Sequence, residues 1–548
     1  MRARLLIAGT LILAQWASVA TQDGAPQVDS IRKAELRADL FFLASDAMRG
    51  RLTDTPENNL AAEWVKARFE RLGLAPGGPD QSYYHPYNLL TATVGTPNTV
   101  EITTSGRTLQ PRSGQDFYPQ RFSANGRAKG EVVFAGFGIS APAQGHDDFT
   151  GAAVKGKIVL ALDHEPGERD PTSPLDGVVT AEAANALRKT LAAQAAGAIA
   201  VLFVTDVHNH PGPQNFEAAA QAFWPDTPPR IERYTLASLM EGVRIPAVQI
   251  SASLAESITG KPIEELGRLA ESKGGMKPLP LPSTEVEITT TVNRHVVPDR
   301  NVLATIEGSD PKLKDEWVIV CAHYDHEGAD GPRIFNGADD DGSGTVGLLE
   351  IAEAYALAAR EGRRPRRSVL FAAWNSEERG LLGAWAYAER PLVPRERIVA
   401  VLNMDMIGRN EEVQEGGGAR FRGLDLQTAE SNRNAINVIG TARSSDMKAA
   451  VQKANAAIGL ELKFRYDNNI SNLMRRSDHW PFLQHGIPAL WFHSGLHPDY
   501  HTVYDRPEKI NYDKIEKAAR LVYQMSWDLA QQTSRPKLGG GATTTMQP

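Results

Sequence analysis

Short apolar runs alternate with longer amphipathic stretches throughout the second half of the chain. Four runs have the length and composition of buried strands, at 317–321, 369–374, 398–404 and 489–492. Between the first two lies a stretch at 345–360 in which apolar residues recur every three or four positions. This alternation of strands and helices predicts a largely parallel, buried sheet that is covered by helices.

The predicted helix at 345–360 has two different faces. Its apolar face carries Leu348, Ile351, Ala352, Tyr355 and Ala359. The opposite face carries Glu350, Glu353 and Arg360. Such a pattern is typical of a helix that buries one face and exposes the other, so we expect Glu350 to lie on the exposed side.

The pattern changes near residue 130. Short β runs appear at 131–134 and 157–162, and an alanine-rich helix at 181–196 leads into another apolar run at 198–204. Prolines alternate with apolar residues at 274–282, which predicts an extended linker. We therefore predict a β-rich insert, with its linker, within a larger α/β domain.

The predicted boundaries follow from these changes. The α/β domain is discontinuous and comprises residues 21–129 and 291–533, and the insert comprises residues 130–290. The glycine- and threonine-rich end, 534–548, predicts a disordered tail.

Residues 1–20 have the features of a cleaved secretory signal. Two arginines precede a run of about ten mostly apolar residues, and small residues follow at Ser18-Val19-Ala20. The run is shorter than the roughly 20 residues that span a bilayer. We therefore expect an exported protein, periplasmic or secreted, without stable membrane insertion after cleavage.

Composition narrows the possible chemistry. The 548 residues include 59 Lys and Arg against 66 Asp and Glu, for a net charge of −7, which argues against nucleic acid as a partner. One Cys is present, so an internal disulfide and a cysteine-based metal site are both excluded. Any chemistry must therefore come from His, Asp, Glu and Ser.

Candidate metal ligands follow each predicted strand of the α/β domain. They are His323 and Asp325 after the first, Glu377 and Glu378 after the second, Asp405 after the third, His501 beyond the fourth, and the triplet Asp339-Asp340-Asp341 before the helix. The carboxyl ends of parallel strands meet at one edge of a sheet, so these side chains should converge. Histidines and carboxylates suit Zn²⁺, and one carboxylate can bridge two ions that act on a single water.

Taken together, these motifs resemble the co-catalytic di-zinc aminopeptidase family, which also contains the glutamate carboxypeptidases and the transferrin receptor. The matching segments are Ala322-His323-Tyr324-Asp325, 336–344, 374–383, 403–408, Arg476-Ser477-Asp478-His479 and Tyr500-His501-Thr502. The insert resembles a protease-associated domain, in 133–138, 154–157 and 196–198. The resemblance implies a zinc exopeptidase-like fold, with a mostly parallel mixed sheet flanked by helices.

The resemblance also implies a role for each residue. Asp340 would bridge two Zn²⁺ ions, His323 and Asp405 would complete one ligand set, and Glu378 and His501 would complete the other. Glu377 would act as general base and acid. Asp325 would orient the imidazole of His323 from behind.

The residues before the Ser-Asp-His motif depart from the pattern of the family. Related enzymes often carry a tyrosine just before the Ser-Asp-His motif, where it stabilises an oxyanion, but Met474-Arg475-Arg476 stands here. Tyr466 or Arg475 would then take that role.

In the insert, His208 and His210 have no third ligand nearby in the sequence, which favours a surface loop.

The leading hypothesis is an exported two-zinc aminopeptidase that acts on peptides. A carboxypeptidase or dipeptidase of the same fold is the first alternative, with Arg409, Arg475 and Arg476 as candidates to bind a substrate carboxylate. The second alternative is a non-catalytic, receptor-like binding protein, which the complete ligand set disfavours. A single-zinc glutaminyl cyclase is disfavoured by the five ligands and the insert, and a serine hydrolase by the absence of a Gly-x-Ser-x-Gly motif.

Overall fold

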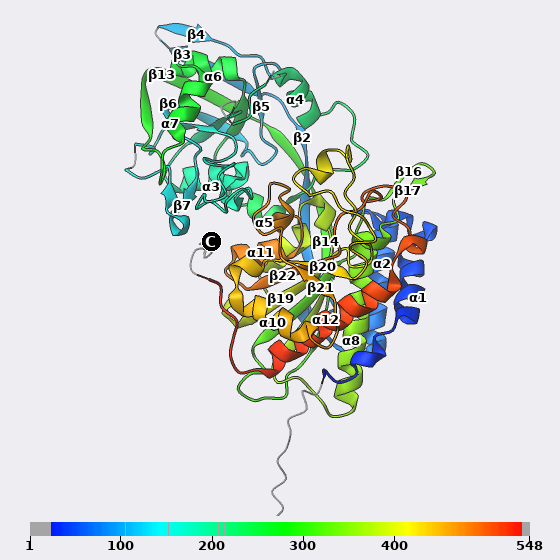
Figure 1. The fold of residues 1–548 in the computed structure, drawn as a ribbon. Coiled ribbons are helices and arrows are strands. Elements are labelled where there is room, and N and C mark those ends of the chain that lie inside the picture. The colour runs from blue at the N-terminus through cyan, green and yellow to red at the C-terminus, as the bar shows by residue number, and fades with distance from the viewer. Residues whose placement is uncertain (1–23, 105, 152, 207–208, 213–214, 540–548) are drawn as a thin grey trace, which may run out of the picture.

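The computed structural model describes residues 24–104, 106–151, 153–206, 209–212 and 215–539 (Figure 1). The predicted signal at 1–20 lies outside this part of the chain, as does the tail from residue 540 onward. No helix among the described residues is long and apolar enough to cross a bilayer.

The four predicted strands form the centre of a ten-stranded sheet. They are β15 (Trp317–His323), β18 (Ser368–Trp374), β19 (Ile398–Met404) and β22 (Ala489–His493). They lie in the order β18-β15-β19-β22, and each neighbouring pair is parallel. This arrangement confirms the predicted α/β class with a mostly parallel mixed sheet.

Shorter or antiparallel strands extend this sheet on both sides. On one side are β1 (Ala75–Pro76), β2 (Tyr84–Val94), β11 (Thr235–Leu236) and β14 (Val292–Ile306), and on the other are β20 (Ala435–Ile439) and β21 (Glu461–Lys463). A two-stranded hairpin, β16 (Ala329–Asp330) with β17 (Arg333–Ile334), lies apart from the sheet.

Helices cover both faces of the large sheet. One face packs against α1 (Lys33–Leu43), α2 (Pro56–Leu72), α8 (Gly344–Arg360), α10 (Ser445–Asn455) and α12 (Tyr512–Gln531). The other face packs against α9 (Leu382–Glu389) and α11 (His479–Gln484), close to α5 (Ala237–Met240). Because both faces are buried, the central strands are apolar throughout instead of alternating.

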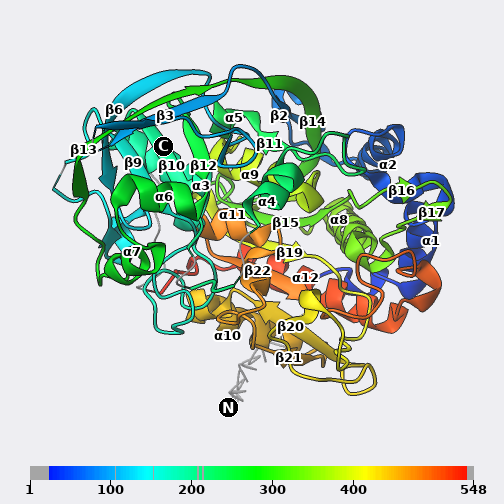
Figure 2. The same ribbon diagram turned by 90° about the horizontal axis from the view of Figure 1, so that it is seen from above.

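The insert contains a second sheet, separate from the first (Figure 2). Its eight strands lie in the order β4-β3-β13-β6-β9-β10-β12-β5, of which β6, β9, β10 and β12 are parallel to one another. Their bounds are β3 (Thr99–Thr104), β4 (Arg107–Leu109), β5 (Phe117–Pro119), β6 (Gly126–Phe134), β9 (Ile158–Leu162), β10 (Ala200–Val204), β12 (Ala247–Ile250) and β13 (Leu279–Thr290). The helices of this region are α3 (Ala186–Ala195), α4 (Phe216–Phe223), α6 (Ala252–Thr259) and α7 (Ile263–Ala270), and a small hairpin joins β7 (Ser140–Ala141) to β8 (His146–Asp147).

The second sheet extends beyond the segment predicted as the insert. Strands β3 to β5 lie before residue 130 but belong to this sheet, which begins at residue 99. The predicted linker at 274–282 runs into β13, which pairs with β6 from Leu279 onward. Apolar patterns locate strands but carry no information on which distant segment each one pairs with, so the extent of the sheet could not be predicted. The long ribbon of β2 and β14 joins the two sheets (Figure 1).

Part of the predicted disordered tail packs onto the larger domain. The backbone amide of Gly539 donates to the carbonyl of Arg443 at 2.7 Å, and that of Lys537 donates to Asp446. The side chain of Ser444 donates to the carbonyl of Lys537. The described residues 534–539 are therefore bound along the domain surface.

Glu350 is buried, which corrects the predicted exposed face of α8. Its side chain is 2% exposed, because α2 packs across the face that carries it. Arg68 of α2 approaches the Glu350 carboxylate, with Nη2 at 3.6 Å from Oε1. Burial, with Glu353 and other carboxylates nearby, raises the pKa of Glu350 to about 8. A polar residue on a helix is therefore not exposed when a second helix packs against the face that carries it.

This burial predicts a pH-dependent stability. Between the ordinary pKa of 4.5 and about 8 the folded protein keeps a proton that the unfolded chain has lost, so the free energy of unfolding falls as pH rises. Glu350→Gln removes this loss. Its stability gain over the wild type should be about 1–3 kcal/mol greater at pH 8 than at pH 5.

Urea denaturation at the two pH values measures this difference. Glu264→Gln is the matched control, because Glu264 is an exposed helical glutamate on α7 of the insert and is not among the carboxylates that raise the pKa of Glu350. Equal gains for Glu350→Gln at pH 5 and pH 8 would contradict the prediction.

Candidate metal centre

The loops at the carboxyl edge of the large sheet converge on one point. His323 is the last residue of β15, Asp405 directly follows β19, and Glu377 and Glu378 begin a short 3₁₀ turn after β18. Asp340 lies in the turn at Ala338–Ser343 that leads into α8. His501, from the loop after β22, completes the group. All the predicted ligands are therefore brought to the same edge of the sheet.

Asp340 lies between two sets of potential ligands. Its Oδ1 is 3.4 Å from His323 Nε2, which in turn is 3.7 Å from Asp405 Oδ1. Its Oδ2 is 2.9 Å from His501 Nε2, which is 3.3 Å from Glu378 Oε2. One carboxylate thus presents an oxygen to each set, the geometry that a bridging ligand requires.

Several of these ligand atoms are buried without a hydrogen-bond partner among the described residues. Both ring nitrogens of His323 and Oδ1 of Asp405 are in this state. The other Asp405 oxygen accepts a hydrogen bond from Ser477. Buried polar atoms without partners are costly unless something else satisfies them, and a cation between these atoms would do so. The donor set of His and carboxylate fits Zn²⁺.

Asp325 lies behind the ligands and orders two of the loops. Its Oδ1 is 3.5 Å from His323 Nδ1 and accepts a hydrogen bond from the amide of Glu377. Its Oδ2 accepts from the amide of Glu378. The fully buried Asp325 carboxylate therefore orients the imidazole ring of His323 and fixes the backbone at Glu377 and Glu378.

The other two aspartates of the triplet support the chain. Asp341 accepts hydrogen bonds from the amides of His323, Gly344 and Met406, which ties three loops together. Asp339 accepts from the amide of Gly408 and approaches His497, whose Nε2 is 3.4 Å from Oδ2. His497 thus faces a supporting carboxylate.

His326 is a residue of this centre that the sequence analysis missed. It is fully buried, and its Nδ1 is 2.6 Å from Glu378 Oε1 and 3.9 Å from Asp340 Oδ2. It is thus close enough to Asp340 and Glu378 to form a third group of potential ligands with them. The available signal was its position, three residues after His323 and therefore still within the loop at the sheet edge.

Arg51 holds the loops of the centre from the side. This arginine is fully buried, and its guanidinium donates to the carbonyls of Tyr324 and Gly337. It also donates to the carbonyls of Leu43 and Asn336. Burial lowers the pKa of Arg51 to about 10, while Asp325, Asp340 and other carboxylates oppose that shift, so it stays charged at neutral pH. It therefore supplies a fixed positive charge beside the carboxylates.

Three residues of the site have left-handed backbone conformations. The φ angles are 58° at Ser376, 59° at Met406 and 54° at His501, each next to or at a predicted site residue. Such conformations cost about 1 kcal/mol or more for residues other than glycine. The surrounding hydrogen bonds hold them, so the direction of each ligand is fixed by the fold.

Glu377 faces the first ligand set from the turn after β18. Its Oε2 is 3.7 Å from His323 Nε2, and its side chain is 9% exposed. Burial raises the pKa of Glu377 well above its ordinary value; His323 opposes this shift and Asp405 adds to it. A carboxylate with a raised pKa accepts a proton more readily than one in water, as a general base requires.

A pocket of about 270 Å³ opens over the ligands. It is lined by Asp340, Glu377, Glu378, Gly380, Leu381, Asp405, Met406, Leu473, Arg475, Arg476, Trp491, Leu496, Tyr500 and His501. Tyr466, one of the two candidates for the oxyanion donor, points elsewhere, because its hydroxyl donates to Glu411 at 2.5 Å. Arg475, Arg476 and Tyr500 are polar side chains in the wall of this pocket.

Arg475 joins the pocket to the insert. Its guanidinium donates to the carbonyl of Thr180 at 2.9 Å and lies 3.3 Å from the Glu182 carboxylate. Arg230 of the insert region donates to the carbonyl of Glu327, whose side chain is 3.3 Å from His501 Nδ1. The insert therefore contacts both the pocket wall and the loop that supports a ligand.

Comparison with known families identifies this arrangement. Residues 301–526 match the model of peptidase family M28, and residues 128–258 match the PA domain. The chain belongs to peptidase family M28, with an inserted PA domain. The predicted family is therefore confirmed, and the part of the chain that matches it contains the buried groups of His, Asp and Glu described above.

Individual curated proteins and solved structures are similar to this chain. The chain is 31% identical over 212 residues to a probable glutamate carboxypeptidase from Arabidopsis thaliana, which covers 37% of this chain and 26% of that protein. It is 25% identical over 262 residues to an aminopeptidase from Mus musculus, with 43% and 30% covered. Among solved structures, an aminopeptidase from Aneurinibacillus sp. strain AM-1 is 18% identical with a TM-score of 0.47, over 93% of this chain and 96% of that one. The chain spans between 26% and 60% of the length of the first curated relatives.

The contact between His326 and Glu378 in this M28 peptidase predicts a measurable effect on metal affinity. His326→Phe removes the donor to Glu378 and should weaken zinc binding about 10–100-fold, as loss of a supporting partner does elsewhere. His326→Asn places an amide donor near the position of Nδ1 and should retain most of the affinity. Chelator competition measures both, and equal affinity in the wild type and both variants would contradict this role.

Proposed function

We propose that this M28 peptidase is a two-zinc aminopeptidase that removes N-terminal residues from peptides. The observation that carries the proposal is the position of Asp340, whose two oxygens face two separate ligand sets. His323 and Asp405 would hold one ion with Asp340, and Glu378 and His501 would hold the other. When bound by these residues, Zn²⁺ would supply Lewis acidity for hydrolysis of the peptide bond and would activate the attacking water.

Glu377 would move the proton in this reaction. Its carboxylate borders the pocket beside the first ligand set, where it would face an attacking water placed over the ligands. It would accept the proton of the attacking water and then give it to the departing amine. Asp325 would act indirectly, since it holds the amide of Glu377 and the ring of His323.

The pairing of the arginines near the pocket disfavours recognition of a substrate carboxylate. Two of the three arginines considered for a carboxylate already have acidic partners. Arg409 pairs with Asp499 at 2.8 Å, and Arg475 lies against Glu182 of the insert. The carboxypeptidase alternative, which the glutamate carboxypeptidase relatives keep open, therefore depends on Arg476 in the pocket wall.

The insert would restrict which substrates reach the ligands. Its loop at 176–182 contacts the wall of the pocket through Thr180 and Glu182, so a folded protein chain would meet the insert first. Short or unfolded peptides would enter more easily. Export, proposed from the pattern at 1–20, would place the enzyme where such peptides are taken up or degraded.

Assays on amino-acyl amides test the proposed chemistry. We expect hydrolysis that a chelator abolishes and added Zn²⁺ restores. Glu377→Gln should lower kcat by about 10²–10⁴-fold, because the proton acceptor is lost while the ligands stay in place. Glu415→Gln is the matched control at an exposed position and should leave kcat unchanged. Full activity without zinc, or in Glu377→Gln, would overturn the mechanism.

Blocked dipeptides separate the two exopeptidase activities. An aminopeptidase should hydrolyse a dipeptide with a blocked C-terminus and reject one with a blocked N-terminus, and Arg476→Gln should alter this preference little. The opposite preference, together with a raised KM for free carboxylates in Arg476→Gln, would establish the carboxypeptidase alternative.

A further inference from the structure

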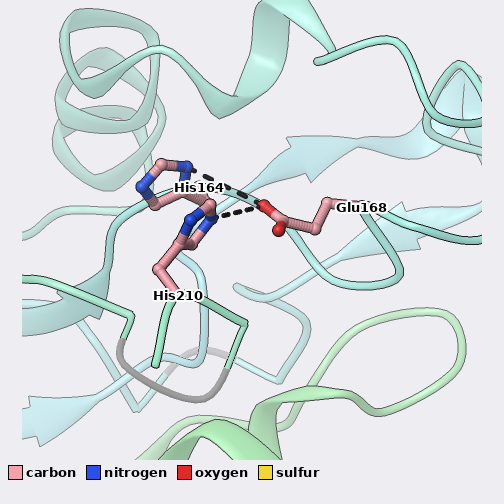
Figure 3. Close-up of side chains that lie close together, drawn as sticks. All are labelled: His164, Glu168 and His210. Carbon is pink, nitrogen blue, oxygen red and sulfur yellow. Dashed lines mark hydrogen bonds and ion pairs between the residues drawn. The ribbon is translucent and has the colours of Figure 1, made fainter. Parts of the chain in front are cut away.

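A second group of potential metal ligands lies in the insert, away from the residues that line the pocket. It consists of His164, Glu168 and His210 (Figure 3). The sequence alone favoured a surface loop for His210, because no third ligand was near it along the chain. The structure supplies the missing partners from the neighbouring loop.

Strand order brings these residues together. His164 follows the end of β9 by two residues, and His210 lies in the loop that follows β10. The two strands are adjacent and parallel, so their following loops leave the same edge of the second sheet. Glu168 lies four residues after His164 in the first of these loops. This is the arrangement that creates the metal centre in the larger domain, repeated on a smaller scale.

The distances suit coordination of one ion. His210 Nε2 is 2.8 Å and His164 Nδ1 is 3.8 Å from Glu168 Oε2, and one ligand atom from each of the three residues lies within 4.8 Å of the others. Ligand atoms around a tetrahedral zinc ion, with bonds of about 2.0–2.1 Å, are roughly 3.4 Å apart. Small side-chain rotations would therefore bring all three into coordination.

The state and exposure of the rings also fit a ligand role. The two imidazole rings are stacked, with centroids 3.9 Å apart, so two protonated rings would repel each other. The side chains of His164 and His210 are 41% and 39% exposed, which leaves room for an ion and a water.

The backbone presents His164 in an unusual conformation. Its φ angle is 63°, in the left-handed region that non-glycine residues rarely adopt. Glu271 links the two loops, because the amide of Gly167 and the side chain of Asn209 both donate to its carboxylate. The two loops are thus joined at their bases, close to the three potential ligands.

We propose that His164, Glu168 and His210 bind one divalent transition-metal ion of the zinc class, with water completing the coordination. Two imidazoles and one carboxylate select such an ion over Ca²⁺ or Mg²⁺, which prefer oxygen ligands. The ion would hold the base of the loop at 164–182. Further along, this loop docks on the catalytic domain, where Asp176 pairs with Arg443 at 2.6 Å and Thr180 contacts Arg475. The ion would therefore have a structural role for the pocket wall.

Zinc stoichiometry of the full-length protein tests the proposal. The protein is dialysed against Zn²⁺ and its metal content is measured for the wild type, His164→Asn and Glu168→Gln. Asparagine tolerates the left-handed backbone of His164, and glutamine keeps the shape of Glu168, so both variants should fold. His295→Asn is the matched control, because His295 is exposed on β14.

We expect the wild type and His295→Asn to bind one zinc equivalent more than His164→Asn and Glu168→Gln. This difference does not depend on how many ions the catalytic domain holds, so it stands even if the proposed aminopeptidase function fails. Equal zinc content in all four proteins would overturn the proposal and would leave Glu168 as a hydrogen-bond partner of His210 alone.

Trypsin cleavage after Arg169 provides a second readout. This arginine is 68% exposed and adjoins Glu168. Zinc should slow cleavage there in the wild type and have little effect in Glu168→Gln. Cleavage that is equally fast with and without zinc in the wild type would also overturn the proposal, since an ion at this site must order the loop.

Discussion

The concentration of buried carboxylates at one edge of the large sheet is the constraint on which the rest of the structure depends. Asp325, Asp339, Asp340, Asp341, Asp405 and Glu377 are each less than a tenth exposed. Unpaired, such charges would repel one another and lose their hydration, which costs several kcal/mol each. The fold reduces this energetic cost in two ways. Backbone amides satisfy the supporting carboxylates, and Arg51 holds the carbonyls of their loops, whereas His323, Asp340 and Asp405 keep atoms directed at one another, where cations would balance them.

The insert contacts the residues that form and support the pocket. Contacts at Arg475 and at Glu327 link it to the pocket wall and to the support of His501. In both sheets the chemistry-bearing side chains come from loops that leave adjacent parallel strands. The same topological rule therefore explains why a group of potential metal ligands lies at one edge of each sheet, although the residues and their surroundings differ.

Strand ends were the part of the site that the sequence could predict. A buried parallel strand is recognisable from its apolar run, and the residue that follows it must lie at the sheet edge, so His323, Glu377 and Asp405 could be placed together without coordinates. Glu350 was misplaced because its burial depends on α2, which lies about 280 residues earlier in the chain. The early start of the second sheet, the contact of His326 with Glu378 and the grouping of His164 with His210 likewise depend on pairing between distant segments. Periodicity along the chain contains none of that information.

Arg51 shows that the catalytic unit is larger than the region by which the family is recognised. The family match begins at residue 301, yet the loops at Tyr324 and Asn336 are held by a guanidinium that lies 273 and 285 residues before them in the chain. That turn and α2 reach the sheet only because the whole insert is looped out between them and β14. A fragment comprising residues 301–526 would thus contain every proposed ligand but lack the side chain that fixes their loops. A fragment in which these loops are held as they are here must therefore include both halves of the interrupted domain.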